Sequence, residues 1–163
     1  MIRELRRNGA QPADTMHKAK VAMVTGMGVV RADTKTGKEV TLPSAETVAN
    51  IEIVNKERIP TGYNAARQDM SDYDIDFTNI SIGEFVKLEV FTGGEKFATD
   101  QFKADDFSGD PELGFAMSVG TDGKWQKSTK DASKYVYAGT MNDNGHKLVM
   151  VEVMADAVAV AGV

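Results

Sequence analysis

The stretch from Asn79 to Phe91, NISIGEFVKLEVF, alternates apolar and polar side chains over most of its length. A period of two is typical of a β-strand that has one buried and one solvated face. The pattern predicts a single strand over residues 79–91, with Phe85 and Lys87 on the outward face. The buried face is expected to carry Ile80, Ile82, Val86, Leu88 and Val90.

Turn signals on either side of this stretch extend the β pattern along the chain. The segment TGGEK (92–96) predicts a turn, and FATDQF (97–102) is the expected partner strand. Asp122-Gly123 and Asn144-Gly145 are two-residue hairpin signals. Residues 20–42 predict a further hairpin, and residues 48–56 (VANIEIVNK) predict a strand.

About eight or nine short strands, with no long helix, define the expected fold class. We expect a mainly β chain that forms a single small β-sandwich or β-barrel-like domain. A length of 163 residues suits one domain. The predicted boundaries are an extended basic arm over residues 1–19 and a β domain over residues 20–163. A long ordered loop is expected over residues 59–78.

The first nineteen residues show no sustained periodicity, because Asn8-Gly9 and Gln11-Pro12 interrupt any helix. Residues 1–20 carry a net charge of +3, whereas the remaining residues carry −8 and the whole chain −5. Such an arm can reach an acidic partner, a nucleic acid or a membrane, although chain ends are often simply frayed. The candidate partner-binding residues are Arg3, Arg6, Arg7, Lys18 and Lys20.

The composition excludes several classes of site. The chain has no cysteine, which rules out disulfides, thiolate zinc sites, iron–sulfur clusters and a cysteine nucleophile. No run approaches about 18 consecutive apolar residues, so no membrane-spanning helix is expected. The arm lacks an aromatic residue on which bases could stack, and the rest of the chain is acidic. We therefore expect no direct binding of nucleic acid.

The segment TGMGVVR (25–31) resembles part of a dinucleotide-binding fingerprint. Gly26 and Gly28 fit the pattern, but Arg31 occupies the position of the third glycine, and a second strand follows instead of a helix. Glycines within a strand pattern favour a bulge or a close approach of another backbone. We expect a bulge at Gly26 and Gly28 rather than a phosphate-binding loop.

Alternating aspartates between residues 69 and 76 are the candidate metal ligands. In an extended segment Asp72, Asp74 and Asp76 would share one face, and clustered carboxylates suit hard cations. The run lacks the glycine and the distal glutamate of a calcium loop, so a solvated face is the competing interpretation. A second acidic group is expected to be a solvated loop and comprises Asp105, Asp106, Asp110 and Glu112.

Nucleophilic catalysis has little support in the sequence. A serine–histidine–aspartate triad would have to use His146, with Asp143 nearby. No serine lies in a G-x-S-x-G segment, and Asp143 is equally well explained as a turn residue.

Several segments, in their order along the chain, resemble a family of tailed-bacteriophage capsid decoration proteins, which act as head cement or stabilisation proteins. These segments are GMGVV, LPSAET, VNKERIPTGYNAARQDMSDY, GEFVKLEVF, EKFATDQF and GTMNDNGHKLVMVEV. The resemblance covers about residues 20–154 and excludes the basic arm.

The resemblance implies a compact β domain on the outer surface of a virion capsid, made in the host cytoplasm. It implies the major capsid protein as partner, often with a homotrimer over a local threefold axis. It also implies no enzymatic activity and no cofactor. An arm that orders on binding could add a strand to the capsid protein, with Arg3, Arg6 and Arg7 providing orientation.

Two other classes of function remain open. One is a small metal-dependent β-fold hydrolase that uses Asp72, Asp74 and Asp76. The other is a β-type surface-binding module for a carbohydrate or receptor, for which Trp125 is the lone tryptophan available as a platform. The apolar tail ADAVAVAGV (155–163) and the strand GFAMSVG (114–120) are expected either in a homo-oligomer interface or in the ordinary core.

Overall fold

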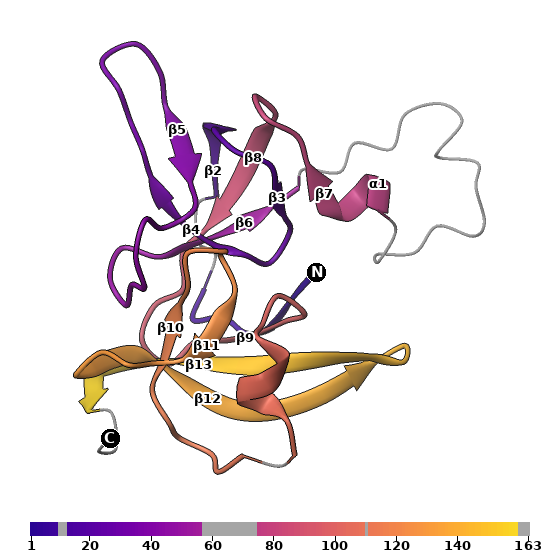
Figure 1. Cartoon of the computed structure of the whole chain (residues 1–163), viewed down its shortest axis with the longest axis vertical. Helices are drawn as coiled ribbons and strands as arrows, with labels where there is room; N and C mark the ends of the chain where they lie inside the picture. Colours follow the sequence, from indigo (N-terminus) through magenta and orange to yellow (C-terminus); the bar gives the residue numbers. More distant parts are fainter. Residues whose placement is uncertain (10–12, 57–74, 110, 160–163) are drawn as a thin grey trace.

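The structure is a computed structural model that describes residues 1–9, 13–56, 75–109 and 111–159. The chain is mainly β, with a closed barrel in the upper part of Figure 1 and a four-stranded sheet in the lower part. This confirms the expected mainly β class and the barrel-like architecture. The predicted loop at residues 59–78 falls outside the described residues except for its last four, which form the short helix α1 (Ile75–Thr78).

The barrel has the strand order β2-β5-β4-β6-β8 and closes where β8 pairs with β2. Strands β2 and β5 are parallel, whereas the other neighbours in the barrel are antiparallel. Its strands are β2 (Asp14–Ala19), β4 (Gly28–Arg31), β5 (Glu39–Thr41), β6 (Glu52–Asn55) and β8 (Phe85–Glu89). Its core consists of Ala19, Met23, Val29, Val40, Val54, Ile80, Val86 and Leu88.

The sheet is antiparallel, in the order β1-β9-β13-β12. Its strands are β1 (Ile2–Arg6), β9 (Lys96–Thr99), β12 (Ala132–Asp143) and β13 (His146–Ala159). Two further pairs of strands lie outside the barrel and the sheet. Strand β3 (Met23–Val24) pairs with β7 (Asn79–Ile80), and β10 (Met117–Val119) pairs with β11 (Trp125–Lys127). The 3₁₀ helix η2 (Ala104–Phe107) follows β9.

The barrel and the sheet share a packed junction. Ile51 precedes β6 and Ile53 lies within it, yet both belong to the second core with Phe97 and Trp125. The β4 backbone also approaches β10, because a Cβ atom at Gly28 would overlap the Val119 side chain. The bulge expected at this glycine is not found, because β4 pairs with β6 in regular register at Gly28 and Val29. The glycine instead allows the close approach of β10.

Gly26 likewise permits a close approach, in this case of the N-terminal residue Met1. It has a φ of +95°, and a Cβ atom there would lie 2.5 Å from the Met1 carbonyl oxygen. The backbone nitrogen of Met1 lies 2.6 Å from both the Thr25 carbonyl oxygen and Asp100 Oδ1. Glycine is thus needed where the 25–28 turn meets the beginning of β1.

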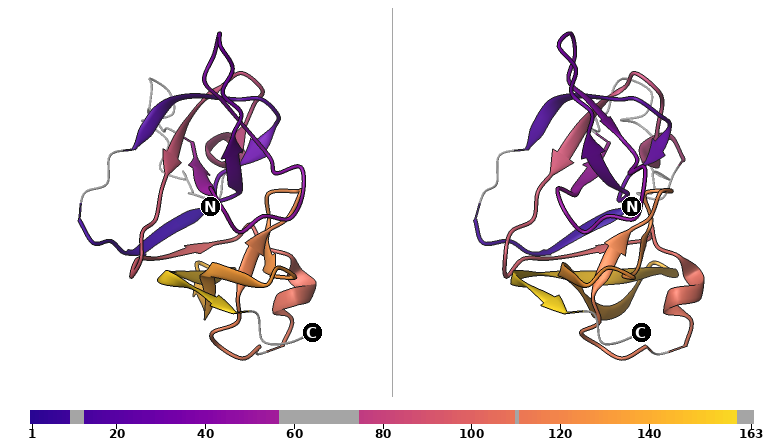
Figure 2. Two further views of the ribbon diagram at one scale, coloured as in Figure 1. Left: turned by 90° about the vertical axis from the view of Figure 1, so that its left-hand side faces the viewer. Right: turned by 60° about the vertical axis from the view of Figure 1, so that its left-hand side comes forward.

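The first nineteen residues are extended, as expected, but their described part is not a separate arm. Ile2–Arg6 pair with β9 as β1, and Asp14–Ala19 complete the barrel as β2 (Figure 2). The side chains of Met1, Ile2, His17 and Ala19 are buried. The sequence could not reveal this because β1 and β2 pair with strands that are remote along the chain.

The strand predicted over residues 79–91 is divided in two. Gly83, at a φ of +81°, turns the chain between β7 and β8. Ile80, Val86 and Leu88 are buried as expected, but Ile82 is 71% exposed at the turn and Val90 is also exposed. The alternation therefore located the strands correctly but missed the turn.

The two-residue hairpin is confirmed at Asn144-Gly145, whereas the Asp122-Gly123 turn belongs to a longer loop over residues 120–124. Asp122-Gly123 lies between β10 and β11, and Asn144-Gly145 joins β12 to β13 with positive φ angles of 51° and 85°. The segment 97–102, expected to pair with residues 79–91, instead pairs through β9 with β1 and β13. The 92–96 turn carries the chain from the barrel into the sheet.

Candidate functional site

The predicted partner-binding cations fall into two groups, and Arg3 and Arg6 belong to the first. Arg3 donates from Nε to Asp143 Oδ2 at 2.7 Å. Arg6 contacts the Gly94 carbonyl oxygen and one oxygen of Glu152, whose other oxygen lies 3.0 Å from Lys96 Nζ. Both side chains thus bind the sheet of their own chain.

Arg7 belongs to the same group and is the most enclosed of the three. Its Nη2 atom lies 3.3 Å from Glu89 Oε2, and its Nη1 atom lies 3.4 Å from Glu95 Oε2. Nη1 also donates to the Val90 carbonyl oxygen at 2.7 Å, and the guanidinium carbon lies 3.7 Å from the centre of the Phe91 ring. Arg7 therefore links the N-terminal segment to the end of β8 and the following turn.

The carboxylates beneath Arg7 are almost entirely removed from solvent. Glu95 has no exposed surface and Glu89 is 3% exposed. Burial would by itself raise the pKa of Glu95, but the Thr92 and Asn8 amides and the nearby Arg7 outweigh it, and the pKa is lowered. The net result favours the charged form of Glu95 inside the protein. Partner binding through the Arg7 guanidinium would compete with these contacts.

Lys18 and Lys20 form the second group, on the outer wall of the barrel. Lys18 Nζ lies 4.8 Å from the centre of the Phe85 ring, which faces it across the β2–β8 pair. Lys20 Nζ lies 3.8 Å from Glu39 Oε2 on neighbouring β5. At this distance, and with Lys20 exposed and Glu39 half-buried, the pair adds little stability.

Large apolar side chains lie beside these lysines. Phe85 is 53% exposed, Met16 is 64% exposed and Ile82 is 71% exposed. Met16 shares a face of β2 with Lys18, while the 81–84 turn is bound to Ala19 through the Gly83 amide and the Glu84 carbonyl. We call this surface the basic–apolar face, and it comprises Met16, Lys18, Lys20, Ile82 and Phe85.

Of the residues of this face, the sequence identified only Lys18 and Lys20 as candidates for partner binding. Phe85 carried a signal, since it was an aromatic residue at an outward position of an alternating strand. Met16 had no signal, because the pairing of β2 was not predicted. Ile82 was misassigned to the core because the turn at Gly83 was not foreseen.

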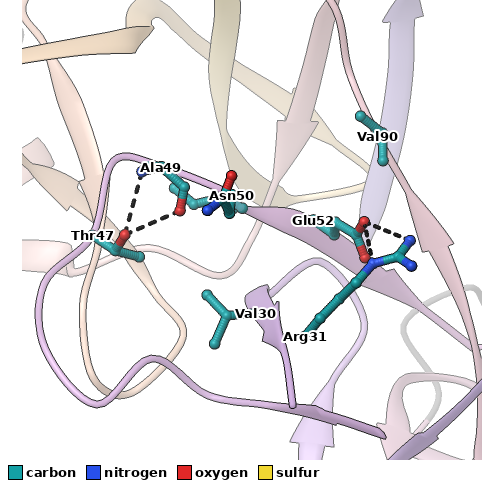
Figure 3. A pocket seen from close by; sticks show the side chains of 8 residues that line it. Val30, Arg31, Thr47, Ala49, Asn50, Glu52 and Val90 are labelled. Carbon is teal, nitrogen blue, oxygen red and sulfur yellow. Dashed lines mark hydrogen bonds and ion pairs between the residues drawn. The ribbon is translucent and has the colours of Figure 1, made fainter. Parts of the chain in front are cut away.

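A separate hollow of about 660 Å³ lies between β4, β6 and the segment before β6 (Figure 3). Arg31 and Glu52 are the ionisable residues among those that line it. Arg31 Nε and Nη2 lie 2.9 and 2.8 Å from Glu52 Oε1, and Asp14 lies 3.2 Å from Nη2. The guanidinium charge is thus compensated by carboxylates, and the remaining lining comes from Val30, Thr47, Ala49, Asn50, Ile51 and Val90.

The two histidines lie apart from this hollow's lining. His17 is fully buried between Asp14 and Asp33, whose carboxylate oxygens lie 3.2 and 2.9 Å from its two ring nitrogens. His146 is exposed and faces Asp143 across the β12–β13 turn. Asp143 accepts a hydrogen bond from Arg3, which gives it a structural partner in the sheet.

The predicted acidic sites are only partly described. Asp69, Asp72 and Asp74 lie outside the described residues, and for Asp76 only the backbone position in α1 is described. Of the second group, Asp110 is also outside, while Asp106 accepts a hydrogen bond from the Lys127 amide. Within the described ranges, no group of three or more histidine or acidic residues is arranged to hold a metal ion.

Trp125 and the small-residue strand belong to the core. Trp125 has no exposed surface and packs against Phe97 and Tyr135. Residues 116–120 are buried as well, which places the AMSVG part of GFAMSVG in the ordinary core, whereas Gly114 is exposed. The tail extends β13 as far as Ala159, with mostly exposed side chains. The sugar platform considered for Trp125 is therefore contradicted.

No family model, curated protein or solved structure matches the chain at a significant level. Among the described residues, no helix has the length and apolar character needed to cross a membrane.

Proposed function

We propose that the chain is a viral structural protein that decorates the outside of a bacteriophage capsid and binds neighbouring capsid subunits. The observation that carries this proposal is the basic–apolar face. A barrel wall with three exposed large apolar residues beside two lysines has the composition of a surface that binds another protein. The resemblance of residues 20–154 to decoration proteins supplies the class of partner.

The compact fold is compatible with this role. The N-terminal strand is paired in the sheet, and the junction between the barrel and the sheet is packed with Ile51, Ile53 and Val119. A body of this kind binds its partner with little loss of conformational entropy. If it binds assembled shells and not free capsid subunits, saturation of its sites stabilises the shell by mass action.

The alternative functions have less support. The hydrolase hypothesis depends on Asp72, Asp74 and Asp76, of which Asp72 and Asp74 lie outside the described residues, and it stays a prediction. The carbohydrate-binding hypothesis depended on an exposed tryptophan, whereas Trp125 is buried. The basic–apolar face thus favours a protein partner over a small substrate.

The proposal is tested by co-sedimentation with empty shells assembled from the major capsid protein of the same virus. We expect saturable binding at a fixed number of copies per shell, and a higher temperature of shell disruption when the sites are filled. Unassembled capsid protein serves as the control. Absence of saturable binding to shells would overturn the proposed function.

A further inference from the structure

We propose that the basic–apolar face is the docking surface, and that it binds an acidic protein surface that offers apolar sockets for Phe85 and Ile82. This inference rests on the proposed function and deepens it. The capsid contact is then made by the barrel wall and not by the N-terminal arginines.

The ion pairs of the chain separate the three arginines from Lys18, whereas Lys20 lies 3.8 Å from Glu39. Arg3, Arg6 and Arg7 lie within 3.4 Å of carboxylates of their own chain. Lys18 is exposed, and its described close contact is the Phe85 ring. A partner carboxylate can reach Lys18 without displacing an ion pair seen in the structure.

The apolar members of the face give it the composition of an interface centre. Interface energy concentrates in a few aromatic and large apolar anchors surrounded by polar residues. Phe85 pairs with Lys18 across β2 and β8, and Ile82 lies three residues before it on the adjoining turn. The backbone hydrogen bonds of β2 and β8 hold these anchors on a closed barrel, so little ordering accompanies binding.

The charges of the face and of the rest of the chain indicate an acidic protein surface as the partner. The chain carries −5 overall, yet this face presents two lysines. The nearby carboxylates are Glu39, which lies 3.8 Å from Lys20, and Glu84, whose charge is compensated by Lys56 at 3.2 Å. An acidic protein surface would be attracted locally to the face and repelled elsewhere, which fixes the orientation of docking. An anionic membrane would also attract lysines beside apolar side chains, but the acidic remainder of the chain opposes a broad anionic plane.

The test compares paired variants in the shell-binding assay. Phe85→Ala, Ile82→Ser and Lys18→Glu alter the face. Leu113→Ser and Lys130→Glu are the controls, because Leu113 is as exposed as Ile82 and Lys130 is an exposed lysine on another loop. Thermal unfolding of every variant identifies those that fold like the unmodified chain, and three independent face variants keep the test valid if one fails to fold.

We expect Phe85→Ala to weaken shell binding about tenfold or more, as truncation of an interface anchor does. Lys18→Glu should weaken it about fivefold at low ionic strength, with a smaller effect in about 0.5 M salt because salt screens charges. The controls should bind like the unmodified chain.

Three outcomes distinguish the proposals. Saturable binding by the unmodified chain that all folded face variants retain would overturn the docking surface and leave the proposed function intact. Failure of the unmodified chain to bind shells would overturn both. Binding to phosphatidylserine-containing vesicles that the face variants lose, without an effect on shells, would replace the protein partner with a membrane.

Discussion

The Nη1 atom of Arg7 lies 3.4 Å from Oε2 of Glu95, a carboxylate with no exposed surface. The same guanidinium group reaches Glu89, which is also buried. Replacing Arg7 with methionine keeps much of the side-chain volume but leaves two buried carboxylates without this cation. We expect the free energy of unfolding to fall by about 3 kcal/mol, measured by urea denaturation at pH 7.

Arg6→Met is the matched control, because Arg6 and its partner Glu152 are accessible to water. We expect a loss below about 1 kcal/mol. Adding Glu95→Gln to Arg7→Met should recover part of the lost stability, since it removes one uncompensated charge. Equal effects of Arg6→Met and Arg7→Met would contradict the anchoring role of Arg7.

Gly28 provides a second prediction, because its Cα faces the side chain of Val119 across the junction of the barrel and the sheet. A Cβ atom at this position would overlap both Val119 methyl groups and approach Ile51. Gly28→Ala should lower the free energy of unfolding by about 1 to 3 kcal/mol through overpacking. Gly37→Ala, at the β4–β5 loop, is the control and should change stability little, because a Cβ atom there would meet only Thr34 Oγ1, at 3.9 Å. Adding Val119→Ala to Gly28→Ala should relieve part of the strain.

The sequence predicted local features of the fold better than its long-range pairing. Alternation placed Val86 and Leu88 in the core, and the Asn144-Gly145 turn was identified because only a few residues tolerate its positive φ angles. Strand β1 was missed because Ile2–Arg6 contain too few apolar residues to establish a period. Its pairing with β9 joins residues that are remote along the chain, which no local pattern encodes.

The candidate site was predictable only in part, for the same physical reason. The charge distribution along the sequence identified the cations of the N-terminal segment as candidates. It could not distinguish Arg7, which contacts buried carboxylates, from Lys18, which contacts an exposed aromatic ring. That distinction depends on where β1 and β2 pair. The exposure of Ile82 likewise depends on the turn at Gly83, a conformation that glycine permits but does not require.

The lone tryptophan allows a spectroscopic prediction. Trp125 is fully buried, with its ring 5.3 Å from Phe97 and 5.1 Å from Tyr135 between ring centres. We expect its fluorescence to resist quenching by iodide in the native state and to shift to longer wavelength on unfolding. Trp125→Ala should cost about 3 to 5 kcal/mol of stability. Efficient quenching in native buffer would show that the indole is accessible and would contradict this packing.

Glu46, in the segment before β6, accepts hydrogen bonds from β10 and from the residues that follow β11. Its Oε1 atom accepts hydrogen bonds from Ser118 Oγ at 2.6 Å and from the Thr129 amide at 2.8 Å, while its Oε2 atom accepts one from Thr129 Oγ1. Partial burial would by itself raise the pKa, but these hydrogen bonds prevail and lower the pKa of Glu46 to about 2. The charged carboxylate is thus bound more tightly in the folded protein than in the unfolded chain.

The sign of the pH dependence follows from this lowered pKa. A glutamate in the unfolded chain protonates near its ordinary pKa of 4.5, whereas folded Glu46 stays charged down to about 2. Its contribution to stability is therefore complete above pH 4.5 and disappears as the pH falls through 2. Glu46→Gln should lower the free energy of unfolding by about 1 to 2 kcal/mol at pH 7, a difference that shrinks toward zero near pH 2. Urea denaturation between pH 2 and 7 measures it, with Glu112→Gln on an exposed loop as the control. A constant difference across this range would mean that the stabilising contacts of Glu46 do not depend on its charge.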